Sequence, residues 1–206
     1  MKKIIYVLAV VLSVVSSCKE KKIIDKNKNL NQVQNEIKEH NHGDHEHGSK
    51  SEVKMTDIKQ NKTRNIATTP ILNAYFQIKN ALVKSDKAKA AKEAKLLLAA
   101  FNKFDTAKLN ESKRKEYKEI VENAQEQAEH IIKSPIEHQR EHFEVLSEDI
   151  TDLITLLGTE KTIYLDFCPM ANNNKGAYWL SEIKEIKNPY FGEKMPTCGS
   201  IKKQIN

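Results

Sequence analysis

The sequence has few of the residues on which common catalytic and nucleotide-binding motifs depend. Its 206 residues include six glycines, three cysteines and one tryptophan. It contains no Cys-x-x-Cys redox motif, no glycine-rich phosphate loop and no nucleophile elbow, and its serines and histidines show no triad order. We therefore expect that the protein is not an enzyme.

The charge pattern offers no case for a nucleic-acid-binding protein. The formal net charge is +6, and removal of Lys2 and Lys3 with the leader described below leaves 32 basic and 28 acidic residues, a net charge of +4. Both signs are mixed along the chain, and no basic patch is interleaved with aromatic residues. We therefore expect no nucleic-acid partner.

The long apolar run at the start of the chain, Ile4 to Val15, is too short to span a bilayer comfortably. It follows Lys2 and Lys3, as in an export signal, and it leads into Val15-Ser16-Ser17-Cys18, which has the form of a bacterial lipobox. This pattern predicts a lipoprotein signal peptide over residues 1–17 and lipidation of Cys18. An ordinary secretory peptide with a chance cysteine is the alternative.

Residues 18–66 contain no aromatic residue and little apolar surface, so we expect a disordered tether. Within it, four histidines fall inside eight positions next to two acidic residues. These histidines are His40, His42, His45 and His47. Imidazoles this dense can converge on Cu(II) or Zn(II) without a preformed fold, and the tract is a predicted secondary metal site. A solvated spacer is the other interpretation.

Residues 67–158 show the helical period in four successive segments. The expected core positions are Ile71, Tyr75, Ile78 and Leu82; Ala91, Ala94, Leu97 or Leu98, Phe101 and Phe104; Tyr117, Ile120, Val121, Ala124, Ala128 and Ile131; and Phe143, Leu146, Ile150, Leu153 and Leu157. Ser85-Asp86 separates the first two segments, Ser134-Pro135 is the expected N-cap and first turn of the fourth, and Gly158 ends it. Because each segment has one apolar face, we expect an antiparallel up-and-down four-helix bundle.

Residues 159–206 change to strand and loop chemistry, so the expected fold is mainly α with a small β/loop-rich cap at the C-terminus. The run from Thr162 to Cys168 predicts a strand, and Asn172 to Gly176 predicts a turn, because Asn and Gly tolerate positive φ. Residues 177–180 and 200–205 are the second and third predicted strands. Trp179, Tyr190 and Phe191 are expected to form the core of this cap.

Three further histidines lie where the third and fourth helices meet. His138 and His142 are four positions apart and so share a helix face, which is a known metal-ligand spacing. His130 precedes the turn and can approach them in an antiparallel hairpin. A solvated polar face is the alternative, since charged residues surround these positions.

The C-terminal segment carries four sulfur-containing residues in two pairs. Cys168 and Met170 are two positions apart, and Met195 and Cys198 are three positions apart. Two thiols and two thioethers favour Cu(I) over hard ions, so these four residues are the predicted primary metal ligands. A Cys168–Cys198 disulfide in an oxidising compartment explains the same cysteines, and both interpretations remain open at this point.

The runs C-P-M-A-N-N-N-K-G-A-Y-W-L-S and K-E-I-K-N-P-Y-F-G-E-K-M-P-T-C-G-S-I carry a resemblance. The segment from about Pro70 to Ile205 resembles an uncharacterised domain of bacterial lipoproteins, which is also appended to periplasmic adaptor (membrane-fusion) subunits of copper/silver efflux systems. The resemblance implies a periplasm-facing helical domain associated with heavy-metal handling. It implies no catalytic reaction.

These observations predict a metal-binding protein of the bacterial cell envelope, lipid-anchored to a membrane and facing the periplasm or the cell surface. Its expected role is copper sequestration or delivery to a transport system, with the metal ion, the membrane and a periplasmic efflux adaptor or transporter as partners. The alternative is a protein–protein binding module of an efflux adaptor system in which Cys168 and Cys198 form a structural disulfide.

Overall fold

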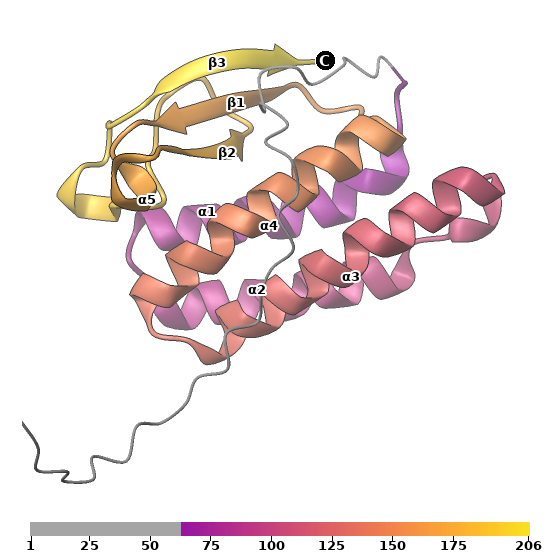
Figure 1. Cartoon of the computed structure of the whole chain (residues 1–206), viewed down its shortest axis with the longest axis horizontal. Helices are drawn as coiled ribbons and strands as arrows, with labels where there is room; N and C mark the ends of the chain where they lie inside the picture. Colours follow the sequence, from indigo (N-terminus) through magenta and orange to yellow (C-terminus); the bar gives the residue numbers. More distant parts are fainter. Residues whose placement is uncertain (1–62) are drawn as a thin grey trace, which may run out of the picture. The chain divides into compact units, whose positions relative to one another are not determined.

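The computed structural model describes residues 63–206, which form a mainly helical fold with a small sheet at the C-terminal end (Figure 1). The predicted signal peptide, Cys18 and the histidine tract lie outside the described residues. The four long helices are α1 (Thr69–Val83), α2 (Lys87–Lys103), α3 (Glu111–Lys133) and α4 (Ile136–Leu157). Short 3-10 turns, η2 (Ile66–Thr68) and η3 (Thr106–Lys108), precede α1 and α3.

Helix ends follow the predicted capping residues with one exception. Asp86 caps α2 by accepting a hydrogen bond from the Lys89 backbone N–H, and Gly158 ends α4 with a positive φ of 81°. The expected N-cap at Ser134 is wrong, because α4 begins at Ile136 and Pro135 takes the N-cap position with extended backbone, φ −65° and ψ 166°. Pro135 has no polar side chain, so this helix starts without a side-chain cap.

The predicted apolar stripes are buried in all four helices, with small shifts in α2. Ala90 is buried and Ala91 only partly, so the stripe of α2 starts one residue earlier than expected. Phe104 lies beyond the helix, half-buried, with its ring stacked on Tyr117 at a centroid distance of 4.7 Å.

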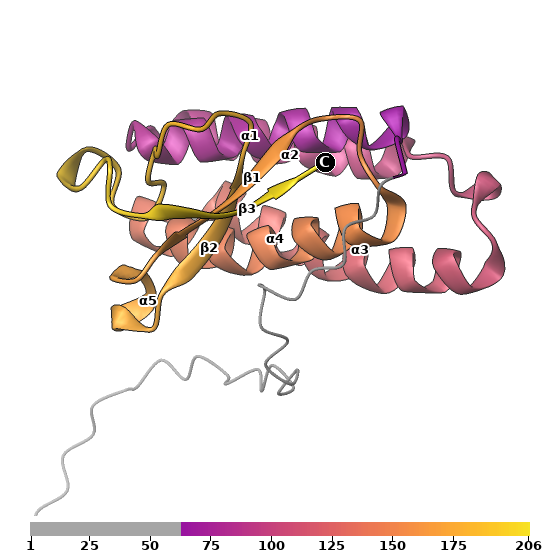
Figure 2. The same ribbon diagram turned by 90° about the horizontal axis from the view of Figure 1, so that it is seen from above.

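The expectation that each helix buries one face is wrong for α1. Besides its predicted stripe, Leu72, Phe76 and Lys79 are also fully buried, so α1 is enclosed on several sides. The reason is that α1 packs on α2 along one side, while the C-terminal sheet, which lies outside the helical region, covers another side (Figures 1 and 2). Consecutive helices, α1 with α2, α2 with α3 and α3 with α4, make the main helix–helix contacts.

The sheet contains the three strands expected from the sequence, β1 (Ile163–Cys168), β2 (Ala177–Ser181) and β3 (Ser200–Ile205). They are antiparallel in the order β2-β1-β3, with Cys168 opposite Ala177 and Phe167 opposite Ser200. The β1–β2 connection includes a short turn, α5 (Ala171–Asn174), in which three consecutive asparagines have positive φ, as the turn chemistry predicts. A last 3-10 turn, η4 (Gly192–Lys194), lies between β2 and β3.

Buried hydrogen bonds fix the sheet across α1 and α4. Ser147 of α4 donates its hydroxyl hydrogen to the Phe143 carbonyl. The Tyr75 hydroxyl is therefore the donor in its hydrogen bond of 2.7 Å with Ser147. The Tyr75 oxygen accepts the Leu180 N–H of β2 at 3.0 Å. One phenol therefore joins α1, α4 and an edge of the sheet.

Within residues 63–206, no helix has the length and apolar character needed to cross a bilayer.

Candidate functional site

The two cysteines meet because of the register of the sheet. Cys168 is the last residue of β1, and Cys198 stands two residues before β3, whose first residue pairs with Phe167. This pairing places the two thiols beside each other, with 2.9 Å between the Sγ atoms. Cys168 is completely buried and Cys198 is half-buried, and neither is in a disulfide.

Cys168 changes the protonation of Cys198. The hydrogen bond with Cys168 raises the pKa of the Cys198 thiol to about 11, and burial acts in the same direction. Cys198 is therefore a thiol, not a thiolate, at neutral pH in the absence of a metal. Since thiolates are the ligand form, binding of a metal must release protons.

The two methionines lie near the cysteines in sequence and differ in exposure. Met170 precedes α5 and exposes 47% of its surface, whereas Met195 is half-buried. The Cys198 N–H donates to the Met195 carbonyl at 3.3 Å, so these two residues share one tight turn. In the part of the chain that the structure describes, no hydrogen bond joins a thioether to a thiol.

Asn188 positions the turn that carries Cys198. It is fully buried, and its side-chain amide donates to the Cys198 carbonyl at 2.7 Å while its own N–H donates to the Pro196 carbonyl at 2.9 Å. Its side-chain oxygen accepts the backbone N–H groups of Tyr190 and Phe191 at 2.8 and 3.1 Å. One amide side chain thus joins the middle of the loop between β2 and β3 to its C-terminal end at Cys198.

Arg140 attaches this loop to the helices. Its Nε donates to the Pro189 carbonyl at 3.0 Å, and its Nη2 donates to the Leu82 carbonyl at 3.3 Å and to the Ser85 hydroxyl at 2.9 Å. Its donors connect α4, the end of α1 and the loop.

The aromatic residues expected to form the core of the cap are covered to different degrees, because Trp179 is fully buried whereas Tyr190 and Phe191 are half-buried. Trp179 of β2 makes an edge contact with Tyr190, whose hydroxyl donates to the Tyr178 carbonyl. Gly199 passes over the indole so closely that a Cβ there would lie 2.8 Å from the Trp179 ring. Its φ of +142° adds a backbone reason for glycine beside Cys198.

Two ionisable residues, one on β1 and one on α1, are buried in the core. Asp166 of β1 and Lys79 of α1 are both fully buried, and Lys79 donates to the Ser181 hydroxyl at 3.3 Å. Burial raises the pKa of Asp166 to about 7, although the Lys79 ammonium and the Trp179 N–H both act to lower it. The sequence signal for this pair is a charged residue inside an apolar run, Leu165-Asp166-Phe167 on the strand and Ile78-Lys79 on the helix.

Of the three histidines at the α3–α4 hairpin, His130 approaches His142 as the antiparallel arrangement predicts, whereas His138 stands apart. His138 is exposed and lies 3.8 Å from Glu141 through its Nδ1. The ring stacked on His142 belongs to His130, with a centroid distance of 4.3 Å and an angle of 17° between the planes. Within residues 63–206, no group of three or more His, Cys, Asp or Glu side chains is placed to hold a metal ion.

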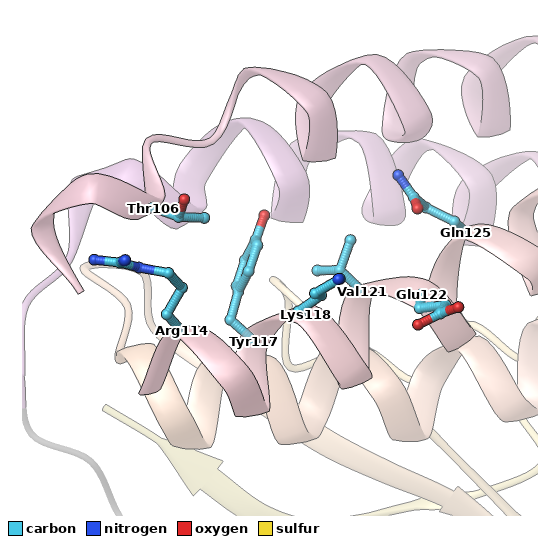
Figure 3. Close-up of a pocket in the computed structure, with 7 residues that line it drawn as sticks. All are labelled: Thr106, Arg114, Tyr117, Lys118, Val121, Glu122 and Gln125. Atoms are coloured by element: carbon cyan, nitrogen blue, oxygen red, sulfur yellow. The ribbon is translucent and has the colours of Figure 1, made fainter. Parts of the chain in front are cut away.

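A surface hollow of about 460 Å³ lies along α3, apart from the predicted ligands (Figure 3). It is lined by Thr106, Arg114, Tyr117, Lys118, Val121, Glu122 and Gln125. Its aromatic residue, Tyr117, stacks on Phe104 and donates to the Phe101 carbonyl at 3.4 Å. These contacts make Tyr117 part of the helix packing.

Comparison with known proteins gives one match. Residues 71–162 match the model of a family described as "Protein of unknown function (DUF3347)". No curated protein and no solved structure matches the chain. The matched residues cover the four long helices and end before β1, so they do not include Cys168, Met170, Met195 or Cys198. A DUF3347 domain is thus found over residues 71–162, ahead of the segment that carries the thiol pair.

Proposed function

We propose that this chain is a lipid-anchored metal-binding protein of the bacterial cell envelope that sequesters copper or delivers it to a transport system. The observation that carries the proposal is the meeting of Cys168 and Cys198, 30 positions apart in sequence, with 2.9 Å between their sulfur atoms. Met170 and Met195 stand in the turns next to them, and we propose that their thioethers complete a soft donor set. We propose no catalytic reaction.

The distance between the thiols lies midway between two chemical states. A disulfide has a bond of about 2.05 Å, so its formation brings the sulfurs about 0.9 Å closer. Two metal–sulfur bonds of about 2.3 Å at a tetrahedral angle place the sulfurs about 3.8 Å apart, so metal insertion separates them by a similar amount. The pair is therefore within a small movement of either state.

Accessibility favours entry of an ion from one side. Cys198 is half-buried and Met170 is exposed, whereas Cys168 is covered completely. We propose that an ion meets Met170 and Cys198 first and that Cys168 is the inner ligand. Thioethers exchange more readily than buried thiolates, which suits a carrier that must release its cargo.

A Cu(I) titration of the mature protein under reducing conditions, against a chromophoric competitor, tests this proposal. We expect one tightly bound Cu(I) per chain that is lost in C168S/C198S, and about tenfold weaker binding, or 1.4 kcal/mol, in M170L and M195L. The chain with His40, His42, His45 and His47 changed to Gln is the control and should keep the Cu(I) site. Equal affinity in wild type and C168S/C198S would refute the proposal.

The second candidate is a protein–protein binding module of an efflux adaptor system, without metal, in which Cys168 and Cys198 form a structural disulfide. The complete burial of Cys168 favours it, because a covered sulfur suits a permanent bond better than an exchanging ligand. Intact mass before and after thiol alkylation separates the two candidates. A pair that resists alkylation until it is reduced supports the disulfide, and two alkylated cysteines in freshly isolated protein exclude it.

We further propose that α1 to α4 close into an antiparallel up-and-down bundle, which would give such a module its rigid helical surface. The packing of each helix on the next one in sequence supports this arrangement. NMR contacts between the start of α1 and the end of α4 test it, and their absence would leave an open row of helices in which α1 and α4 do not close the bundle.

A further inference from the structure

The stacked imidazoles of His130 and His142 join α3 to α4 and are not part of the proposed sulfur site. His130 lies near the end of α3 and His142 within the first turns of α4, so the pair spans the helical hairpin. We propose that His130 and His142 form a second site, for a borderline divalent cation such as Zn²⁺, that clamps α3 to α4.

Gln127 gives His142 the tautomer that a metal ligand needs. The Gln127 side chain is buried, and its amide oxygen lies 2.9 Å from the His142 Nδ1. An amide oxygen can only accept, so Nδ1 carries the hydrogen and the lone pair of His142 is on Nε2. This is the arrangement in which a neighbouring acceptor orients a metal-bound histidine and raises its basicity.

The surroundings also favour the neutral, metal-binding form of the ring. Burial first, and then the neighbouring His130 and His138, lower the pKa of His142, whereas Glu141 and Glu126 act to raise it. The net direction is downward, which favours the neutral imidazole that binds a metal.

The second ligand, His130, is the more exposed of the two. His130 is exposed, so its ring can turn about its side-chain bonds and direct a nitrogen to an ion held by His142 at about 2.0 to 2.1 Å. Two protein ligands leave the other coordination positions to water. His138 is not part of this site, because it is exposed and placed against Glu141.

Thermal unfolding of the full chain with and without Zn²⁺ at neutral pH tests the site. A site present in the folded hairpin and lost on unfolding raises the Tm, by roughly 5 to 10 °C at a hundredfold excess over its Kd. The four histidines from His40 to His47 lie within eight positions. They can therefore bind Zn²⁺ equally well in the folded and the unfolded chain, so this binding should shift the Tm little.

We expect the zinc-dependent rise to disappear in H130Q and H142Q and to persist in H138Q, the matched control on the same hairpin. Because His130 is exposed, H130Q should fold as the wild type does. Q127M should weaken zinc binding about tenfold, since it removes the acceptor that orients His142. A purely structural Gln127 would instead lower the Tm without zinc and leave the zinc-dependent rise unchanged.

The same measurement in C168S/C198S separates this site from the thiol pair. The rise should remain there, whatever the outcome of the Cu(I) titration. A zinc response that is equal in wild type and H130Q, or one that is lost in C168S/C198S but kept in H130Q, would overturn the inference.

Discussion

A single buried amide, that of Asn188, holds the conformation of the predicted metal site. The sequence pattern points instead to the four sulfur-containing residues themselves. In the structure, the Asn188 side-chain amide donates a hydrogen bond to the Cys198 backbone carbonyl. Its side-chain oxygen accepts the backbone N–H groups of Tyr190 and Phe191. No sequence motif marks it, because asparagine before proline reads as an ordinary turn residue.

We predict that N188A lowers the free energy of unfolding by about 3 kcal/mol, because it leaves the Cys198 carbonyl and two backbone N–H groups buried without their partner. Urea unfolding followed by circular dichroism measures this loss. N73A, which changes an exposed asparagine of α1, is the control and should change stability little. N188D keeps the acceptor and loses the donor to Cys198, so it should weaken Cu(I) binding as well as stability.

At the scale of elements, a carboxylate joins α4 to the turn that carries Met170. Asn172 of α5 donates to the Glu144 carboxylate at 2.7 Å. Burial raises the pKa of Glu144 to about 7, and the hydrogen bond from Asn172 acts in the opposite direction. The folded protein therefore holds this proton at pH values where the unfolded chain has released it.

The free energy of unfolding should accordingly fall as the pH rises from about 4.5 to about 7, because the folded state binds more protons in this window. E144Q should make this fall shallower, since Gln can still accept from Asn172 but carries no charge. Asp166, whose pKa burial also raises to about 7, contributes with the same sign, and His142, whose pKa is lowered, contributes with the opposite one.

Urea unfolding across this pH range measures the slope, and E119Q, a change of an exposed glutamate on α3, is the control. The assignment of Glu144 fails if E144Q and E119Q change the slope equally.

At the scale of the whole molecule, the helices and the sheet form one core. Tyr75 and Lys79 of α1 each contact a residue of β2, and Arg140 of α4 binds the loop between β2 and β3. The DUF3347 match ends at residue 162, before any of these strands. The matched helices alone therefore leave much of α1 without its cover.

We predict that a chain ending at residue 162 loses cooperative unfolding and binds the dye ANS, because the apolar surface of α1 that the sheet covers becomes exposed. Thermal unfolding followed by circular dichroism, together with ANS fluorescence, compares this chain with the full-length protein. A cooperative transition at an unchanged midpoint would show that the helices fold without the sheet.

Local patterns were enough to predict the four helices and the three strands within a few residues. Apolar residues at helical spacing mark the buried face of α3, and Asp86 and Gly158 mark helix ends through their own hydrogen-bonding and backbone preferences. The N-cap predicted at Ser134 is wrong because Pro135, which follows it, has an extended backbone and occupies the N-cap position itself.

The sequence by itself determined which segments become helices and strands, because periodicity and capping act over a few residues. Tertiary structure decided which side chains meet. It placed His130 rather than His138 against His142, enclosed α1 beneath a sheet, and brought Cys198 to Cys168 through strand register and the buried Asn188. These contacts join residues far apart in the chain, so they depend on packing and register that no local pattern contains.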